Sequence, residues 1–251
     1  MTVQQNSPRP GIYLVTDPPL SLATHTPERH FRSEAERHSA AIDLTTQLVE
    51  TVVAAGVSTV QLRWKNVDAR YFYDLSLAVS DVTAGTADLI INDRVDVYLA
   101  AREAGAQLAG VHIGQTDLHP SSVRKLIGQD AQIGWSVSQP AEIAEANRLA
   151  DVIDSAGVGV LRTTATKTDA PPPLGFDGIA RLADELKVPT TAIGGIKTAD
   201  IAHLAPSVHN IAVVSALVAS PAPGQEAREM VRLFNHARQP GETFTANAQG
   251  A

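Results

Sequence analysis

Cysteine is absent from this chain of 251 residues, and aromatic residues make up only 4% of it. A chain without thiols has no disulfide, no thiol nucleophile and no zinc–thiolate site. Apolar runs long enough to cross a membrane are lacking as well, and the polar start MTVQQNSPRP does not have the pattern of a signal peptide. We therefore expect a soluble cytoplasmic protein without a membrane partner.

An excess of positive charge is also missing, because the formal net charge is −7. This balance argues against general nucleic-acid binding, so cationic residues in a cleft would serve a local anion. The hydrophobic residues, 44% of the chain, must build the core mainly from Val, Ile, Leu and Ala. Such a core suits parallel strands that are buried on both faces. The length allows one large α/β barrel or two small domains.

Short apolar runs alternate with segments of helical periodicity along most of the chain. The runs expected to form strands are 12–16, 58–63, 89–92, 110–113, 132–136, one run within 151–160, 190–195 and 210–215. The segments expected to form helices are 41–55, 69–82, 95–104, 121–128, 141–149, 176–186, 198–205 and 225–237. This alternation, without a break in composition, predicts an α/β protein with a single (β/α)₈ TIM barrel.

A doubly wound sheet is the competing fold. Such a sheet usually carries a glycine-rich fingerprint after its first strand, but the first strand here runs into VTDPP. The G-x-G sequence at Gly157-Val158-Gly159 lacks the third glycine, because Arg162 occupies that place. The barrel is therefore the preferred prediction.

The barrel is expected to be one catalytic domain over residues 11–237, between flexible tails at residues 1–10 and 238–251. Residues 20–40 are polar and rich in His, Arg and Glu, and we interpret them as an insertion that leads into the first helix. The later segment RTTATKTDAPPPLG is too long and too rich in Thr and Pro for a simple connection. Loops of that kind in compact domains are usually functional or disordered.

Two carboxylates follow consecutive strands within residues 87–117, Asp93 after LIIN and Asp117 after GVHI. A helix between two buried strands makes them parallel, so both carboxylates would face one cleft at the carboxyl end of the sheet. The spacing predicts that this helix ends at Gly105 and turns inward the residues Val97, Leu99, Ala100 and Ala104. The alternative for Asp93 is a helix N-cap, and for Asp117 a cap or a turn before Pro120.

An amide and two cations alternate at the end of the second strand, where Gln61, Arg63 and Lys65 share one side. The alternative is a solvated strand end, which is common for one residue and less so for three in phase. Hard carboxylate oxygens in a cleft that also holds cations suggest Mg²⁺ bridging to a diphosphate. The pair of aspartates facing Arg63 and Lys65 therefore predicts a site for a metal-bound diphosphate.

A second phosphate site is expected where the last two strands end. Gly194-Gly195 follows the seventh strand and Val214-Ser215 the eighth, a place where barrel enzymes often hold a phosphate. Glycines there let backbone N–H groups approach the phosphate, although a simple turn explains a Gly-Gly pair equally well. The long loop adds Thr164, Thr166 and Lys167, which a polar loop without a function would also explain.

A histidine and two tryptophans lie close to these positions. His112 belongs to the fourth strand and is either a general base or, by preference, a packed and hydrogen-bonded side chain. Trp64 and Trp135 either fill the core or offer stacking surfaces for a flat ring.

Eight motifs carry a likeness to a known family. They are YLVTD (13–17), QLRWK (61–65), IINDRVD (90–96), GVHIGQTDL (110–118), IGWSVS (133–138), TTATK (163–167), AIGGI (192–196) and VVSA (213–216). In this order and spacing they resemble the thiamine-phosphate synthase family over residues 11–237. The resemblance implies a (β/α)₈ barrel that joins hydroxymethylpyrimidine diphosphate to 4-methyl-5-(2-phosphooxyethyl)thiazole in thiamine biosynthesis. Diphosphate would be released with the help of Mg²⁺, leaving thiamine phosphate.

The resemblance also implies roles for individual residues. Asp93 and Asp117 would hold Mg²⁺, and Ser136 would lie beside the departing diphosphate. The groups that would contact the diphosphate or the pyrimidine are Gln61, Arg63, Lys65, Asn92 and Lys167. Those that would hold the thiazole phosphate are Thr164, Thr166, Gly194, Gly195, Val214 and Ser215. The chemistry would be largely dissociative. The catalytic residues would then be Arg63, Lys65, Ser136 and Lys167.

The chain departs from the family pattern in three places. Trp64 stands where the family usually has Glu or another polar residue, and GVGVLRTTATK lacks both prolines of the pattern GxGPxxPTxTK. The family's Ser-Thr-His is here Ser136-Val137-Ser138. The alternative function is therefore that of a related barrel without transferase activity, a thiazole tautomerase or a ligand-binding regulator. In either case the partners are small molecules, and the sequence leaves open whether the chain forms a homo-oligomer.

Overall fold

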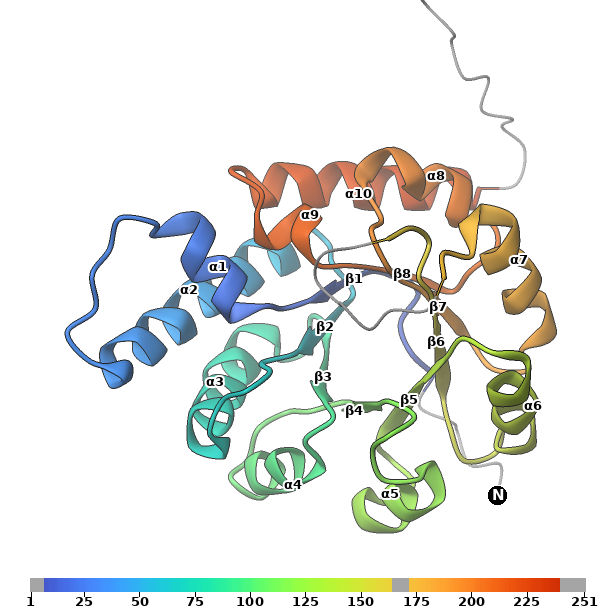
Figure 1. The fold of residues 1–251 in the computed structure, drawn as a ribbon, viewed down its shortest axis with the longest axis horizontal. Coiled ribbons are helices and arrows are strands. Elements are labelled where there is room, and N and C mark those ends of the chain that lie inside the picture. The colour runs from blue at the N-terminus through green and yellow to red at the C-terminus, as the bar shows by residue number, and fades with distance from the viewer. Residues whose placement is uncertain (1–6, 164–171, 240–251) are drawn as a thin grey trace, which may run out of the picture.

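A computed structural model describes residues 7–163 and 172–239 of the chain. Eight parallel strands in sequence order close into a barrel, with the first strand beside the last (Figure 1). They are β1 (Gly11–Val15), β2 (Thr59–Leu62), β3 (Asp88–Asn92), β4 (Gly110–Ile113), β5 (Gln132–Val137), β6 (Ser155–Val158), β7 (Thr190–Ala192) and β8 (Asn210–Val213). The predicted (β/α)₈ barrel is confirmed.

Helices surround the strands in an outer ring (Figure 1). They are α1 (Pro18–His25), α2 (Glu34–Ala54), α3 (Ala69–Thr83), α4 (Val95–Glu103), α5 (Pro120–Ile127), α6 (Pro140–Arg148), α7 (Gly175–Glu185), the 3₁₀ turn η1 (Thr198–Asp200), α8 (Ile201–Leu204), α9 (Ser215–Val218) and α10 (Pro223–Ala237). Among the described residues, no helix has the length and apolar character needed to span a membrane.

Successive residues of the strands face two different layers. In β1, Ile12 and Leu14 belong to the large apolar cluster shared with the helices, whereas Tyr13 and Val15 belong to a small cluster inside the barrel. Burial of each large aliphatic side chain in the outer layer contributes about 1.5–3 kcal/mol. The outer layer therefore holds the fold together, which leaves the upper end of the barrel interior available for polar groups.

The helix α2 begins earlier than its apolar periodicity predicts. The sequence places its start near Ala41, but the helix begins at Glu34, where the Ser33 side chain accepts a hydrogen bond from the Glu36 N–H at 3.2 Å. The first turns carry polar residues because they extend away from the barrel, where no apolar stripe is needed (Figure 1). Residues 20–40 thus comprise most of α1, a connection and the start of α2, and their description as an insertion stays a prediction.

The predicted inward face of α4 is wrong, because the helix buries a different set of residues. The structure buries Val95, Val97, Tyr98 and Ala101, so of the residues predicted to face inward only Val97 does so fully. The large Tyr98 ring is buried, and this sets the rotation of the helix. The predicted stop is confirmed, because Gly105 follows the helix with a φ of +96°.

The predicted hydroxyl cap of α5 is also wrong. The His119 side chain caps this helix by accepting a hydrogen bond from the Ser121 N–H at 3.3 Å. The predicted end at Gly128 is confirmed by a φ of +88°.

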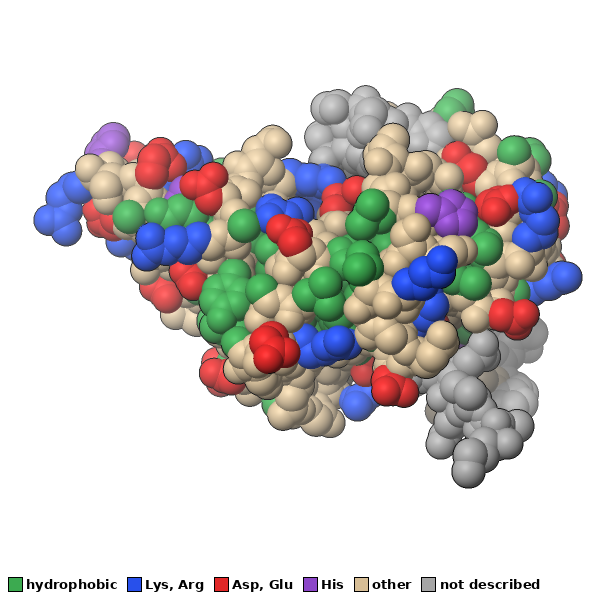
Figure 2. All heavy atoms as spheres, turned by 90° about the horizontal axis from the view of Figure 1, so that it is seen from below, with side chains coloured by type: hydrophobic (Ala, Val, Ile, Leu, Met, Phe, Trp, Pro, Cys, Tyr) green, Lys and Arg blue, Asp and Glu red, His purple; other side chains and the backbone are tan. Residues whose placement is uncertain are grey.

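The N-terminal end of the described chain lies beside the barrel. His209 makes a 2.8 Å hydrogen bond to the Pro8 carbonyl, and Arg9 forms an ion pair with Asp88. The predicted flexible tails, residues 1–10 and 238–251, fall largely outside the described residues. On the face drawn in Figure 2, positive and negative side chains are interspersed, without one large basic patch.

Candidate active site

A pocket of about 430 Å³ opens at the carboxyl ends of the strands, and all eight strands or the loops after them contribute to its lining. Most of the residues predicted for the site line it: Gln61, Arg63, Lys65, Asn92, Asp93, Asp117, Ser136, Gly194, Gly195, Val214 and Ser215. The other predicted residues, Thr164, Thr166 and Lys167, lie outside the described residues. The barrel therefore gathers into one cavity groups that are widely separated in sequence.

The alternating side chains after β2 all reach this pocket. The Gln61 amide donates a 2.8 Å hydrogen bond to the Tyr13 hydroxyl, and both residues are buried. The Arg63 guanidinium lies 3.6 Å from the Asp17 carboxylate, and Lys65 forms an ion pair with Asp93. The two cations are thus held at the mouth by acidic partners from two different loops.

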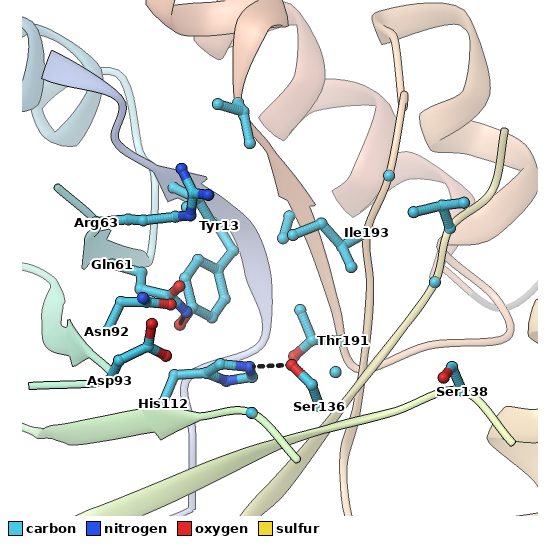
Figure 3. A pocket seen from close by; sticks show the side chains of 18 of the residues that line it. Tyr13, Gln61, Arg63, Asn92, Asp93, His112, Ser136, Ser138, Thr191 and Ile193 are labelled. Atoms are coloured by element: carbon cyan, nitrogen blue, oxygen red, sulfur yellow. Dashed lines mark hydrogen bonds between the residues drawn. The ribbon is translucent and has the colours of Figure 1, made fainter. Parts of the chain in front are cut away.

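Tyr13 is a pocket residue that the sequence reasoning missed. The alternation in YLVTD could have indicated it, because Tyr13 is in phase with Val15 and both side chains face the barrel interior. Burial raises the pKa of the Tyr13 hydroxyl, so this group stays neutral at ordinary pH. Figure 3 shows its ring beside Gln61 and Asn92, where it forms a flat wall of the cavity.

The two aspartates predicted to meet do so. The pKa of Asp117 is raised, first by burial and further by the neighbouring Asp93 carboxylate, so the two groups lie within interaction distance. Asp93 has a φ of +61°, and the N-cap of α4 is Arg94, which makes no side-chain capping bond. The helix-cap alternative for Asp93 is therefore not supported by the structure.

Asp117 also stabilises a turn. Its carboxylate accepts a 2.7 Å hydrogen bond from the Gly114 N–H, which fits the turn alternative for this residue. The turn and a ligand role are compatible, because a carboxylate has several acceptor sites. The bond fixes the Asp117 side chain beside Asp93, where both carboxylates line the cavity.

This pair of carboxylates fits one particular kind of metal ion. The described residues contain no group of three or more His, Asp or Glu side chains that could hold a metal. Two carboxylates fit Mg²⁺, which is commonly bound through one or two carboxylates and takes its remaining oxygen ligands from water and substrate phosphates. Asp93 and Asp117 are thus suited to an ion that arrives with a phosphorylated substrate.

His112 lies at the floor of the pocket, where its ring packs against two glycines. A Cβ atom on Gly134 would lie 2.5 Å from the His112 Nδ1 atom, and one on Gly157 would lie 3.0 Å from its Cε1 atom. The ring Nε2 atom makes a 2.8 Å hydrogen bond with the Ser136 hydroxyl (Figure 3). His112 is therefore packed and hydrogen-bonded, as preferred from the sequence, and it also faces the cavity.

The two tryptophans belong to the core. Trp64 is 8% exposed and Trp135 5% exposed, and neither is among the described residues that line the main pocket. The Trp64 ring makes an edge contact with His38 at 5.5 Å between centroids. Trp135 makes one with His119 at 6.4 Å and lines a smaller hollow beside the mouth. Stacking of a flat substrate in the main pocket is therefore not their role.

The corner between β7 and β8 is shaped by backbone. Gly194 and Gly195 have φ values of +103° and +70°, which only glycine adopts readily. A Cβ atom on Gly194 would come within 2.4 Å of the Val160 Cβ, so the chain approaches the β6 loop closely here. Val214 and Ser215, at the start of α9, complete the corner. An anion in this corner would meet backbone groups rather than bulky side chains.

Comparison with known proteins agrees with this geometry. The family model described as thiamine monophosphate synthase matches residues 35–217. A thiamine-phosphate synthase of Corynebacterium efficiens is 39% identical over 188 residues, which cover 74% of this chain and 87% of that protein. The chain belongs to the thiamine monophosphate synthase family. The resemblance inferred from the motifs is thereby confirmed.

Another relative supports this assignment, and one solved structure is similar in fold. A thiamine-phosphate synthase of Vibrio campbellii is 36% identical over 208 residues, which cover 82% of this chain and 89% of that protein. The solved thiamine phosphate pyrophosphorylase from Pyrococcus furiosus aligns with a TM-score of 0.72 and 24% identity, over 91% of this chain and 97% of that one. At that identity the solved structure supports the fold.

Two departures from the family pattern have structural counterparts. Val160, at the place of the first missing proline, is 6% exposed and packs against Gly194. Ser138, at the place of the family's histidine, donates a 2.7 Å backbone hydrogen bond to Glu142, and its hydroxyl lies 3.1 Å from the same carboxylate. Both residues also line the pocket, so the substitutions change its surface without opening the fold.

Proposed function

We propose that this protein is a thiamine-phosphate synthase. It transfers the hydroxymethylpyrimidine group from its diphosphate to 4-methyl-5-(2-phosphooxyethyl)thiazole and gives thiamine phosphate and diphosphate. The observation that carries the proposal is the meeting of Arg63 and Lys65 with the Asp93–Asp117 pair in one pocket of a member of this family. A cavity that holds both cations and hard anions suits a metal-bound diphosphate.

The cations assist departure of the leaving group. The bond from the pyrimidine methylene carbon to the diphosphate oxygen breaks, and that carbon then forms a bond to the thiazole nitrogen. Arg63 and Lys65 are held at the mouth before substrate arrives, so they stabilise the charge that develops on diphosphate at little reorganisation cost. Bound Mg²⁺, for which Asp93 and Asp117 are the proposed ligands, would supply further neutralisation of that charge.

The remaining residues orient the two substrates. Gln61 and Asn92 face the pocket as amides suited to hydrogen bonds with an aminopyrimidine ring, and Ser136 presents a hydroxyl from the floor. Gly194, Gly195, Val214 and Ser215 are the proposed cradle for the thiazole phosphate, together with Thr164, Thr166 and Lys167, which lie outside the described residues. A reaction of this kind needs no activated nucleophile from the protein, since the thiazole nitrogen attacks.

A two-substrate assay tests the proposal. Pure protein is incubated with both substrates and Mg²⁺, and the release of diphosphate and the formation of thiamine phosphate are followed together. We expect equal amounts of the two products, and none when either substrate is omitted. Absence of product under conditions in which an established synthase turns over would contradict the proposal and favour a tautomerase or a ligand-binding regulator. The cytoplasmic location stays a prediction.

A further inference from the structure

The loops after β6 and β7 are joined by three successive hydrogen bonds. The Leu161 N–H donates to the Ile193 carbonyl and the Arg162 N–H donates to the Gly194 carbonyl, both at 3.1 Å. The Arg162 guanidinium continues the series, because its Nη1 atom donates to the Gly195 carbonyl at 2.9 Å. Three consecutive carbonyls of the β7 loop are therefore turned toward the β6 loop.

This orientation has a consequence for the N–H groups of the same peptides. In a trans peptide the C=O and N–H bonds point in opposite directions. The N–H groups of Gly194, Gly195 and Ile196 are therefore turned away from the β6 loop. Because β7 lies between β6 and β8 in the barrel, they face the side on which Val214 and Ser215 line the pocket. Successive N–H groups on one side form a concave anion site.

Arg162 contacts this corner without lining the pocket. It is not among the described residues that line the pocket, and its guanidinium forms a two-pronged pair with Asp200, at 2.5 Å and 2.9 Å. Asp200 is 8% exposed and also accepts a 2.8 Å hydrogen bond from the Lys197 N–H. The Phe176 ring lies 6.0 Å below the guanidinium. The group that holds the Gly195 carbonyl is thus itself fixed on several sides.

Gly195 and Arg162 also fit each other sterically. A Cβ atom on Gly195 would lie 2.6 Å from the Arg162 Cγ atom, so the arginine stem occupies the space that any other residue would fill. A guanidinium holds its donors in a rigid planar fork, and in Arg162 this fork reaches a carbonyl and a carboxylate at the same time. A lysine at this place would supply a single point charge for the two partners.

We propose that Arg162, held by Asp200, is a positioning residue that orients the Gly195–Ile196 peptide and thereby sets the affinity for the phosphate of the thiazole substrate. The proposal rests on the proposed function, which places the thiazole phosphate in this corner. From the sequence alone, Arg162 is notable only as the residue that interrupts a glycine-rich fingerprint.

The kinetic test measures the effect of Arg162 on each substrate separately. The variants Arg162→Met and Arg162→Lys are assayed for kcat and for the KM of each substrate. For Arg162→Met we expect the KM of the thiazole phosphate to rise on the order of ten- to a hundredfold, because small displacements of positioning groups have effects of this size. The KM of the pyrimidine diphosphate should stay unchanged, and Arg162→Lys should lie between the wild type and Arg162→Met.

A matched control comes from another pair of an arginine with an aspartate. Arg124 is paired with Asp154 at 2.6 Å and donates to the Val152 and Gly128 carbonyls, away from the residues that line the pocket. Arg124→Met should lower the melting temperature without separating the two KM values. If Arg162→Met does not fold, Arg162→Lys decides, since a wild-type KM for both substrates in that variant would overturn the proposal.

A binding measurement distinguishes failure of this inference from failure of the proposed function. Wild type and both variants are titrated with the thiazole phosphate and with inorganic phosphate by calorimetry, which requires no turnover. Weaker binding of both ligands by the variants supports the inference even if the wild type makes no thiamine phosphate. Equal affinities, or a rise of both KM values by the same factor, would overturn it.

Discussion

Asp93 combines an ion pair, a left-handed backbone conformation and a proposed role as a metal ligand. It forms an ion pair with Lys65 and adjoins Asp117, and it adopts a φ of +61°. Asn and Asp tolerate this left-handed conformation better than other residues with a side chain. Asp93→Asn therefore removes the charge without straining the turn, which makes it a cleaner test than a change to alanine.

We expect Asp93→Asn to reduce kcat by about 10²–10³, the size of effect seen when one preorganised electrostatic contact is removed. Raised Mg²⁺ concentration should restore part of the lost activity, because a weakened metal site is filled at a higher concentration of the ion. The melting temperature should stay close to that of the wild type. Steady-state kinetics over a Mg²⁺ titration measures the effect.

Asp96→Asn is the control for this change. Asp96 is three residues away, forms a surface pair with Arg94 and is not among the described residues that line the pocket. Its replacement should leave kcat unchanged. Full activity of Asp93→Asn would mean that Asp93 serves the turn alone and that the proposed metal ligands are wrong.

At the level of the element, local polar contacts determine where helices begin. Ser33 caps α2 through the Glu36 N–H, although no apolar periodicity is present in that turn. For α5 the sequence predicts a cap from Ser121 or Ser122, but the His119 side chain makes the capping bond. His119 precedes Ser121 by two residues, and this offset along the chain decides which side chain can reach the free N–H groups.

Two serine substitutions test this difference. Ser33→Ala should lower the free energy of unfolding by about 1 kcal/mol, the usual contribution of an N-cap side chain. Ser122→Ala should leave it unchanged, because Ser122 is exposed and makes no capping bond in α5. Urea unfolding followed by circular dichroism measures both. An equal loss in the two variants would show that composition rather than capping geometry determines the start of these helices.

The sequence predicted those site residues whose position depends on a strand and the loop directly after it. Gln61, Arg63 and Lys65 follow from alternation in one strand, and Asp93 follows from the end of the next. The packing of His112 could not be predicted in this way, because the pairing of β5 with β6 must bring Gly134 and Gly157 to the same side chain. The contact of Arg162 with Asp200 joins residues 38 positions apart and likewise depends on the closed barrel.

At the scale of the whole molecule, alternation of strands and helices was a sufficient signal for the fold. The eight strands pair with their neighbours in sequence order. Closure of the barrel then pairs the first strand with the last. The phase of single helices was a weaker signal, as α4 illustrates, because the burial of one aromatic ring can rotate a short helix. Errors of this kind leave the topology unchanged, since each helix still covers its own pair of strands.

The stability of the barrel in acid should depend on the contact between the β6 and β7 loops. The hydrogen bond from Arg162 holds the pKa of Asp200 below its usual value of 3.8. An acid with a lowered pKa in the folded state stabilises the protein above its unfolded pKa, and this contribution is lost as the pH falls through the folded pKa. Asp200→Asn should therefore be less stable than the wild type near neutral pH, and the difference should shrink in acid.

Urea unfolding from about pH 7 down to about pH 3 measures that difference. Asp96→Asn is the comparison, because the pKa of Asp96 is also lowered by an arginine, but its side chain is 63% exposed. Solvent and salt screen such a surface pair, so its stability profile should follow the wild type closely. The difference in free energy of unfolding between Asp200→Asn and wild type could instead stay constant with pH. Asp200 would then act through its shape and hydrogen bonds, and its charge would not stabilise the contact between the two loops.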